Sequence, residues 1–384
     1  MERKRILSRD YKIGNAITEA LSCNRTNIIE QIKDSGLKGK CRTDFSTGIK
    51  WELAANLPGN NKYVICNADE GEPGTFKSRI LLQNHIETLI EGMIIAGYAI
   101  NSNNGIIYLR AEYRWMLKDL IKKVDKLREK DFLGKNILGK NFDFDIEFRL
   151  NAGAYICGEE TSLIESLEGK RGEPRNKPPY PTEKGYLDCP TIINNVETFC
   201  YVPYIINEGI EEFKKTSNTK LFSVSGDCER ADIYEIDLNT KIIDLLGLIG
   251  AKDTKSVLIG GTSGIVISEK DFDKPINYKG LPAGSSIIVF NNSRNMRKIL
   301  KNFMEFFVEE SCGHCTPCRE GNIKLLEAIE KINKGDSIPD KYIQTLLELA
   351  EIMKMSSKCS LGRSSANSFI NFYKIEYRDY IYGN

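Results

Sequence analysis

The sequence predicts a multidomain α/β protein that ends in a helical bundle, and three patterns along its 384 residues support this prediction. Up to about residue 215, strand-like runs such as residues 63–66 alternate with helical stretches such as residues 84–100, as in layered α/β folds. Short β segments with turns rich in Gly, Asn and Asp follow, and after Asn295 apolar residues recur at helical spacing. We therefore expect three domains, over residues 1–215, 219–292 and 295–384.

The bulk composition argues against several classes of partner. Lys and Arg total 54 against 53 Asp and Glu, so a formal charge of +1 gives no general attraction to nucleic acid. The longest nearly uncharged apolar stretch, residues 92–100, is much shorter than the ~20 residues that a membrane-spanning helix needs. The basic N-terminus lacks the apolar segment of a secretory signal. We expect a cytoplasmic protein that binds no nucleic acid and does not insert directly into a membrane.

A tight group of cysteines is the strongest chemical signal in the sequence. Eleven cysteines in a long chain without a secretory signal indicate metal ligation or redox chemistry more than a disulfide framework. Cys312, Cys315 and Cys318 form a C-x2-C-x2-C run, and Cys359 follows well after them. A cubane cluster needs four thiolates around one small volume, which a tight loop and a distant fourth cysteine can supply. We therefore predict a [4Fe–4S] cluster at these four residues.

Zinc is the competing metal, because four cysteines also bind it tetrahedrally, although zinc sites usually pair two C-x2-C knuckles. His314 lies inside the cysteine loop and is either a further ligand or, as we expect, a residue that fills the turn or tunes the cluster. The remaining cysteines show no ligand spacing and are expected to be small buried hydrophobes: Cys23, Cys41, Cys66, Cys157, Cys189, Cys200 and Cys228.

Two loops that follow strand-like runs carry candidate nucleotide-binding groups. NADEGEPGTF, at residues 67–76, holds three carboxylates that can bind ribose hydroxyls or flavin N–H groups but would repel phosphate; an ordinary solvated acidic turn is the alternative. GAYICGEETS, at residues 153–162, indicates a glycine turn that leads into a helix, with Tyr155 available for stacking. Glu159 and Glu160 there are either ligand-binding groups or ordinary helix-capping carboxylates.

A third candidate segment is basic and stiffened by proline. It reads GKRGEPRNKPPYP and spans residues 169–181. Stiff cationic loops suit diphosphates, because little entropy is lost when they become ordered. A plain surface crossing explains the segment equally well.

Taken together, these segments closely resemble the NADH-binding flavoprotein subunit of respiratory complex I, the 51 kDa subunit, and its relatives in NAD-linked hydrogenases and formate dehydrogenases. The resemblance implies a Rossmann-like FMN domain, a β-grasp domain of the soluble-ligand-binding type and a helical bundle that holds the iron–sulfur cluster. The matching segments span most of the chain in the family's order: residues 63–79, 153–161, 169–181, 194–198 and 309–321.

The resemblance also implies cofactors and the residues that bind them. A [4Fe–4S] cluster, FMN and NAD(H) are expected, with hydride transfer from the nicotinamide to the flavin, single-electron exit through the cluster and no catalytic acid or nucleophile. The residues implied for FMN are Gly39, Lys50, Asn67, Asp69, Tyr155, Gly158, Glu159, Asn194 and Asn195. Those implied for NAD are Phe45 and Tyr180, which would stack, and Glu72, Glu160 and Lys177.

One loop departs from the family's pattern. Where the family has GRGGAGFPTGxKW, residues 39–51 read GKCRTDFSTGIKW, so three glycines and the proline are absent. Each non-glycine residue forced into left-handed geometry costs roughly 1–2 kcal/mol. Asp44 would also repel a diphosphate by ~1 to ~4 kcal/mol at about 4 Å, unless Arg42 pairs with it or binds a phosphate. Weakened nicotinamide binding is therefore expected here.

These observations favour an NADH dehydrogenase-type electron-transfer subunit. The alternatives are a paralogue with impaired nucleotide binding, which serves as an iron–sulfur relay or structural subunit, and a flavin-based electron-bifurcating subunit. We expect partner subunits with their own iron–sulfur centres, such as a thioredoxin-like [2Fe–2S] subunit, a hydrogenase, a formate dehydrogenase or a complex I-type assembly.

Overall fold

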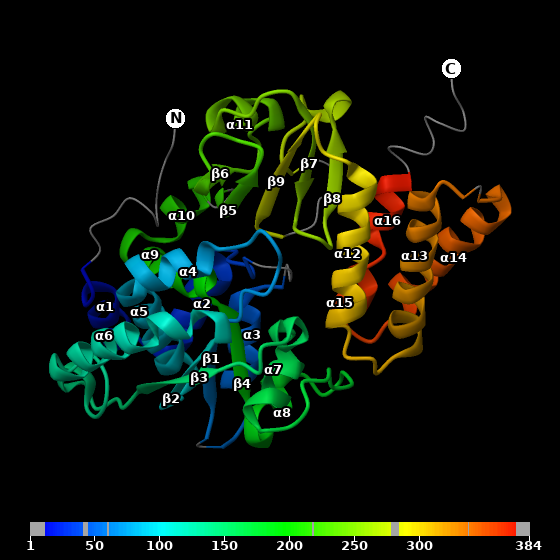
Figure 1. The fold of residues 1–384 in the computed structure, drawn as a ribbon. Coiled ribbons are helices and arrows are strands. Elements are labelled where there is room, and N and C mark those ends of the chain that lie inside the picture. Colours follow the sequence, from blue (N-terminus) through cyan, green and yellow to red (C-terminus); the bar gives the residue numbers. More distant parts are fainter. Residues whose placement is uncertain are drawn as a thin grey trace. The chain divides into compact units, whose positions relative to one another are not determined.

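The chain folds into two compact units, which are described separately below (Figure 1). The computed structural model describes residues 12–40, 45–59, 61–216, 219–277, 284–336 and 338–373. The first unit comprises residues 1–71, 76–221 and 235–237, and the second comprises residues 72–75, 222–234 and 238–384. The finer division into three domains stays a prediction.

The first unit is built around a four-stranded parallel sheet with strand order β3-β2-β1-β4. Its strands carry mostly Val, Ile and aromatic residues at buried positions, which suits a sheet covered by helices. The strands are β1 (Tyr63–Ala68), β2 (Asn104–Leu109), β3 (Asp145–Leu150) and β4 (Thr191–Asn195). This sheet is the Rossmann-like layer expected from the sequence.

Helices α5 and α9 pack against this sheet and against each other (Figure 1). In α5 (Ile86–Ile100), 13 of 15 residues are buried, because other helices cover its outer side. Gly92 allows the close approach, since a Cβ there would lie 2.1 Å from the carbonyl oxygen of Phe199 in α9 (Val196–Glu208). The remaining helices are α1 (Asn15–Ser22), α2 (Arg25–Asp34), α3 (Thr47–Ala55), α4 (Lys77–Asn84), α6 (Leu117–Glu129), α7 (Glu160–Leu167), α8 (Pro181–Lys184) and α10 (Ile210–Thr216), with the 3-10 turns η1 (Ala111–Met116), η2 (Ile137–Gly139), η3 (Tyr155–Gly158) and η4 (Tyr186–Asp188).

A five-stranded mixed sheet with strand order β6-β5-β9-β7-β8 lies mainly in the second unit. The parallel strands β5 and β9 are neighbours at its centre, and β7 runs antiparallel to both β8 and β9. Counted along the chain, this order is 2-1-5-3-4, and the helix α11 (Ile242–Ile249) follows the second strand, so the expected β-grasp topology is confirmed. The strands are β5 (Thr219–Gly226), β6 (Asp232–Asp237), β7 (Thr254–Ile259), β8 (Ile265–Ser268) and β9 (Ser286–Asn291), with the 3-10 turn η5 (Glu269–Asp271).

The chain continues into the expected helical bundle. Met304, Leu325, Ala350 and Phe369 come from four helices and share one apolar core. In the described ranges, no helix is both long and apolar enough to cross a membrane. The helices are α12 (Met296–Glu310), α13 (Thr316–Lys334), α14 (Asp340–Ser356), α15 (Ser360–Ser364) and α16 (Asn367–Phe372).

A buried ion pair joins several segments of the first unit. Lys77, at the start of α4, pairs with Glu197 in α9, and the two side chains are 2% and 0% exposed. The Lys77 Nζ also donates to the carbonyl oxygen of Lys40, at 2.9 Å. The second carboxylate oxygen of Glu197 accepts from the backbone N–H of Leu221, at 3.0 Å. The pair therefore holds α4, α9, β5 and the start of the altered loop together.

We expect Glu197→Gln to lower the free energy of unfolding of the first unit by about 3–5 kcal/mol, because it leaves the buried Lys77 cation without a carboxylate. Both tryptophans of the chain, Trp51 and Trp115, lie in this unit, so tryptophan fluorescence during urea unfolding reports on it. Glu52→Gln is the matched control: Glu52 pairs with Lys33 at 2.8 Å, but the two side chains are 39% and 40% exposed, so a loss below about 1 kcal/mol is expected. Equal losses in the two variants would contradict the role of the buried pair.

Candidate functional site

The carboxyl ends of β1 and β4 form the natural ligand site of the parallel sheet. Strands β2 and β3 lie on one side of β1 and β4 lies on the other, so the strand order reverses between β1 and β4. Ligands of open α/β sheets bind outside the carboxyl ends of the strands at such a switch point. The register places Asn67 beside Asn195 and Cys66 beside Asn194. Three asparagines that the sequence implicated in FMN binding are thus adjacent at this edge.

Asn67 connects the acidic loop to the loop that precedes α7. Its side-chain N–H donates to the carbonyl oxygen of Gly158 at 2.9 Å, and its Oδ1 accepts from the backbone N–H of Asp69 at 3.1 Å. A Cβ at Gly158 would lie 3.5 Å from the carbonyl oxygen of Asp69 and 3.6 Å from its carboxylate, so the two loops are within van der Waals contact here. A Cβ at Gly71 would lie 2.8 Å from the ring of Tyr155, which shows that the acidic loop passes directly over this ring. Asn67, Asp69, Tyr155 and Gly158 are therefore brought together.

Helix α3 brings a lysine to the same edge of the sheet. The Lys50 Nζ donates to the backbone carbonyl of Ile193 in β4 at 2.8 Å, and the Trp51 indole donates to Asn194 at 3.2 Å. Burial lowers the pKa of Lys50, and the nearby Glu160 opposes that shift. Thr47, one turn earlier, is fully buried, and its hydroxyl has no hydrogen-bond partner among the described residues. A cation and an unused donor on one helix face suit an anionic group such as the phosphate of FMN.

Glu159 is engaged by the protein itself. It is the N-cap of α7, where its carboxylate accepts from the backbone N–H groups of Thr161 and Ser162 at 2.8 and 3.0 Å. Burial opposes its ionisation, but Lys177 and these hydrogen bonds together lower the pKa of Glu159. Lys177 Nζ lies 2.9 Å from Glu159 and 2.6 Å from Glu160. The helix N-terminus thus already holds a carboxylate, and this part of the site suits ring or ribose groups more than phosphate.

The predicted NAD residues are divided between the two units. Phe45 and Tyr180 belong to the first unit and are 49% and 51% exposed, so both rings are available for stacking. Glu72 belongs to the second unit, where its carboxylate accepts from the hydroxyl of Thr262 at 2.8 Å and from the backbone N–H of Ser263 at 3.4 Å. Burial raises the pKa of Glu72 to about 7, although these hydrogen bonds act in the opposite direction. The assignment of these residues to NAD stays a prediction.

The ends of the altered loop are closed by hydrogen bonds. The Gly39 N–H donates to the carbonyl of Phe45 at 3.1 Å, and the Lys40 N–H donates to the hydroxyl of Thr198 at 3.0 Å. Residues 41–44, which carry Arg42 and Asp44, lie outside the described part of the chain. The sequence reasoning missed Lys77 and Thr198 as supports of this loop. No signal marks Lys77 in the sequence, because lysines are almost always solvated.

The four predicted cluster ligands are brought together in the helical bundle. Cys312 follows α12, Cys315 is the N-cap of α13, Cys318 lies in the first turn of α13, and Cys359 is the N-cap of α15. Burial raises the pKa of the Cys318 thiol to about 11, and the charges of Cys315, Cys359 and Cys312 add to the rise. In the described ranges no three His, Cys, Asp or Glu side chains form a site for a single metal ion.

Close packing around Cys318 fits a cluster. A Cβ at Gly362 in α15 would lie 2.9 Å from the Cβ of Cys318 and 2.7 Å from the Cβ of Ser357. The bare glycine therefore lets α15, which carries Cys359 at its start, rest directly on Cys318. The Ser357 hydroxyl is buried and has no partner among the described residues, so it can donate to a cluster sulfur. His314 instead lies 3.2 Å from the Lys358 ammonium, which favours the predicted role outside the ligand set.

Comparison with known proteins matches both regions of the chain. The family model described as "Nuo51 FMN-binding domain" matches residues 32–204, and the one described as "NADH-ubiquinone oxidoreductase-F iron-sulfur binding region" matches residues 298–380. An NADH-quinone oxidoreductase subunit of Aquifex aeolicus is 43% identical over 337 residues, which cover 84% of this chain and 78% of that protein. The chain belongs to this family of NADH-quinone oxidoreductase subunits. The resemblance stated from the sequence is therefore confirmed, as are its FMN-binding domain and its iron–sulfur region.

Relatives within hydrogenases show that members of the family also occur as parts of longer chains. The alpha subunit of the NAD-reducing hydrogenase HoxS of Cupriavidus necator is 43% identical over 360 residues, which cover 92% of this chain and 60% of that one. A chain of a solved NAD+-reducing [NiFe]-hydrogenase in the H2-reduced state superposes on this structure with a TM-score of 0.86 and 34% sequence identity. The match covers 94% of this chain and 63% of the hydrogenase chain. The chain thus spans less than two thirds of the length of these two relatives.

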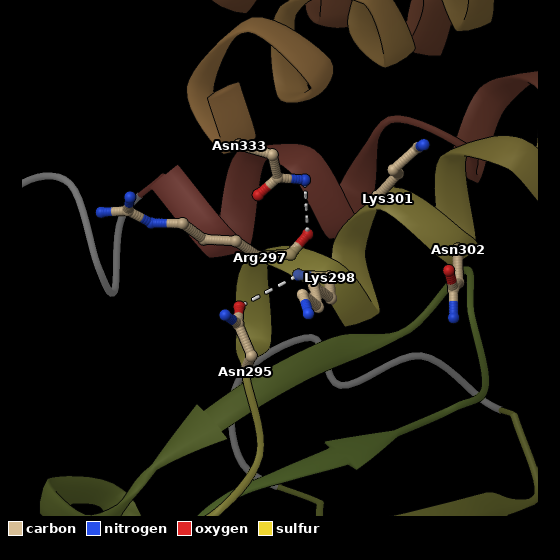
Figure 2. Close-up of a pocket in the computed structure, with 6 residues that line it drawn as sticks. All are labelled: Asn295, Arg297, Lys298, Lys301, Asn302 and Asn333. Carbon is tan, nitrogen blue, oxygen red and sulfur yellow. Dashed lines mark hydrogen bonds between the residues drawn. The ribbon is translucent and has the colours of Figure 1, made fainter. Parts of the chain in front are cut away.

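A separate pocket of about 510 Å3 lies at the start of α12, whereas the cysteine motif of the family follows the end of this helix. Figure 2 shows Arg297, Lys298 and Lys301 pointing in different directions, so the three cations do not converge on one anion. Lys301 is also paired with Glu305 and Glu330, at 3.3 and 3.2 Å. Three asparagines complete the lining: Asn295, Asn302 and Asn333. We do not consider this pocket a cofactor site.

We expect Gly362→Ala to reduce the bound iron and sulfide per chain several-fold, because the added methyl group would overlap Cys318 and displace α15 with Cys359. Gly247→Ala is the matched control, since Gly247 also lies within a helix, α11, and a Cβ there meets nothing within 4 Å. Iron analysis and the visible spectrum of the two anaerobically purified variants compare them. Full iron content in Gly362→Ala would show that close packing at this glycine is not needed.

Proposed function

We propose that this chain is an electron-transfer subunit that oxidises NADH through FMN and one [4Fe–4S] cluster and passes electrons to a partner iron–sulfur subunit, or runs in the reverse direction. The observation that carries the proposal is the presence of two cofactor sites in one chain. One is the polar edge at Asn67 and Asn195, and the other is the set of four cysteines in the bundle. When bound, FMN supplies a centre that accepts a hydride and releases electrons singly to a one-electron acceptor.

The residues of the chain bind and orient, and none is needed as an acid or a nucleophile. For FMN we propose Gly39, Lys50, Asn67, Asp69, Tyr155, Gly158, Glu159, Asn194 and Asn195, with Glu159 acting mainly by capping α7. For NAD we propose stacking by Phe45 and Tyr180, with Glu72, Glu160 and Lys177 around the dinucleotide. For the cluster we propose Cys312, Cys315, Cys318 and Cys359 as ligands; their spacing and the close packing of α15 on Cys318 support a shared site.

The proposal includes a partner subunit. The four cysteines account for a single cluster, so we propose that electrons leave this cluster for a redox centre in another subunit. The named relatives belong to hydrogenases and quinone oxidoreductases, which supports a separate iron–sulfur subunit as the acceptor or donor. We also propose a cytoplasmic location, where NADH is available.

The proposal predicts about four iron atoms and one FMN in each anaerobically purified chain, and bleaching of the flavin by NADH. Iron, sulfide and extracted flavin are quantified first, and NADH is then titrated while flavin absorbance is followed. Four iron atoms without flavin, even after FMN is supplied, would contradict the dehydrogenase function. Such a result would favour a relay paralogue.

We infer from the sequence that Asp44 weakens the binding of NADH, because its carboxylate would repel the diphosphate. Asp44→Gly, which restores the family's residue, should lower the dissociation constant for NADH roughly tenfold or more, with unchanged FMN content. The control is Asp253→Gly, which removes an exposed carboxylate from a turn of the β-grasp sheet. An unchanged dissociation constant in Asp44→Gly would show that the loop tolerates this charge.

A further inference from the structure

Two polar side chains point at one of the proposed cluster ligands. Cys318 is 5% exposed, and its Sγ lies 3.3 Å from the side-chain Nδ2 of Asn322 and 3.3 Å from the hydroxyl of Ser311. Asn322 follows Cys318 by one turn of α13, so both side chains lie on the same face of the helix. Asn322 is fully buried.

The chemistry of the ligand fixes the direction of both hydrogen bonds. A cysteine that binds iron is a thiolate, which can accept hydrogen bonds but has no proton to donate. The amide of Asn322 must therefore present its N–H group to the sulfur. The Ser311 hydroxyl already accepts from the backbone N–H of Gly313 at 3.2 Å, so its own proton is available for Cys318.

A buried amide at position 322 lowers the stability of the fold unless it makes a hydrogen bond. Its Oδ1 is buried and has no hydrogen-bond partner among the described residues, and a buried unsatisfied polar group costs about 1–3 kcal/mol. Leu325 and Ala328, on the same helix, belong to the apolar core of the bundle, so an apolar residue would suit the packing at position 322. Among the described residues, the contact that explains an amide here is the one with the Cys318 sulfur.

We propose that Asn322 sets the reduction potential of the cluster by donating a hydrogen bond to Cys318. This inference rests on the proposed function. Reduction adds an electron to the cluster and increases the negative charge on its sulfurs, so the donated hydrogen bond is stronger in the reduced state. Hydrogen bonds to cluster sulfurs are one of the means by which proteins tune these potentials. Asn322 therefore raises the potential and favours acceptance of an electron, while Ser311 acts in the same direction.

The test is a redox titration of the full chain, purified anaerobically, with the reduced cluster followed by electron paramagnetic resonance. Asn322→Leu removes the donor and keeps the branching of the side chain at Cγ. At the midpoint potential of the wild-type cluster, we expect the ratio of reduced to oxidised cluster to fall about tenfold, which corresponds to 59 mV for one electron. Iron content should be unchanged. Ser311→Ala should shift the ratio in the same direction.

Asn333→Leu is the matched control, because it makes the same substitution on the same helix. The Asn333 amide donates to the backbone carbonyl of Arg297 at 3.4 Å and touches none of the cluster cysteines in the described structure. An unchanged ratio is expected there. If Asn322→Leu has full iron content and an unchanged ratio, the inference is overturned while the proposed function stands. A wild-type chain that holds no iron overturns both.

A measurement on the wild-type chain covers the case in which Asn322→Leu loses its cluster. The protein is labelled with 15N in the side-chain amide of asparagine, and the reduced cluster is examined by pulsed paramagnetic resonance. A hyperfine coupling to 15N supports the hydrogen bond from Asn322, because this amide nitrogen lies 3.3 Å from a ligand sulfur. The absence of any such coupling in a fully reduced cluster overturns the inference.

Discussion

The buried pair of Lys77 and Glu197 is the interaction on which the nucleotide half of this protein depends. The Glu197 carboxylate joins α9 to the first strand of the β-grasp sheet and, through Lys77, to the carbonyl of Lys40 at the start of the altered loop. Each partner alone would be an uncompensated charge in the core, so the segments can come together only as a set. The pair thus ties Lys40, at the described start of the loop, to the folded core.

The two proposed cofactor sites are built by different means. At the sheet, parallel strands end at one edge, and this brings Asn67 and Asn195 side by side although they are far apart in the sequence. In the bundle, Cys315 and Cys359 are the N-caps of two helices, so the starts of α13 and α15 position these two proposed ligands. Cys318 lies in the first turn of α13, where the side chains of Asn322 and Ser311 supply hydrogen bonds to its sulfur.

Charge is balanced closely around the sheet edge. Lys177 pairs with both Glu159 and Glu160, and Lys50 lies 4.0 Å from Glu160. The cations of this region that the sequence suggested for a diphosphate are thus engaged by carboxylates, and a dinucleotide would have to compete for them.

The sequence by itself determined the α/β fold class, a small β-rich region, a helical region and the four cysteines, whereas the β-grasp topology was implied by the resemblance to the family. These follow from local periodicity and from the C-x2-C-x2-C spacing, which is short enough for one loop to set the geometry. It also marked Asn67, Tyr155 and Gly158, because the loops that follow strands carry ligands. Only the tertiary structure decided that Glu159 caps α7, that Glu72 binds the turn at Thr262, and that Asn322 faces Cys318. Each of these depends on which neighbour a polar side chain meets after folding, and residue type and local spacing do not contain that information.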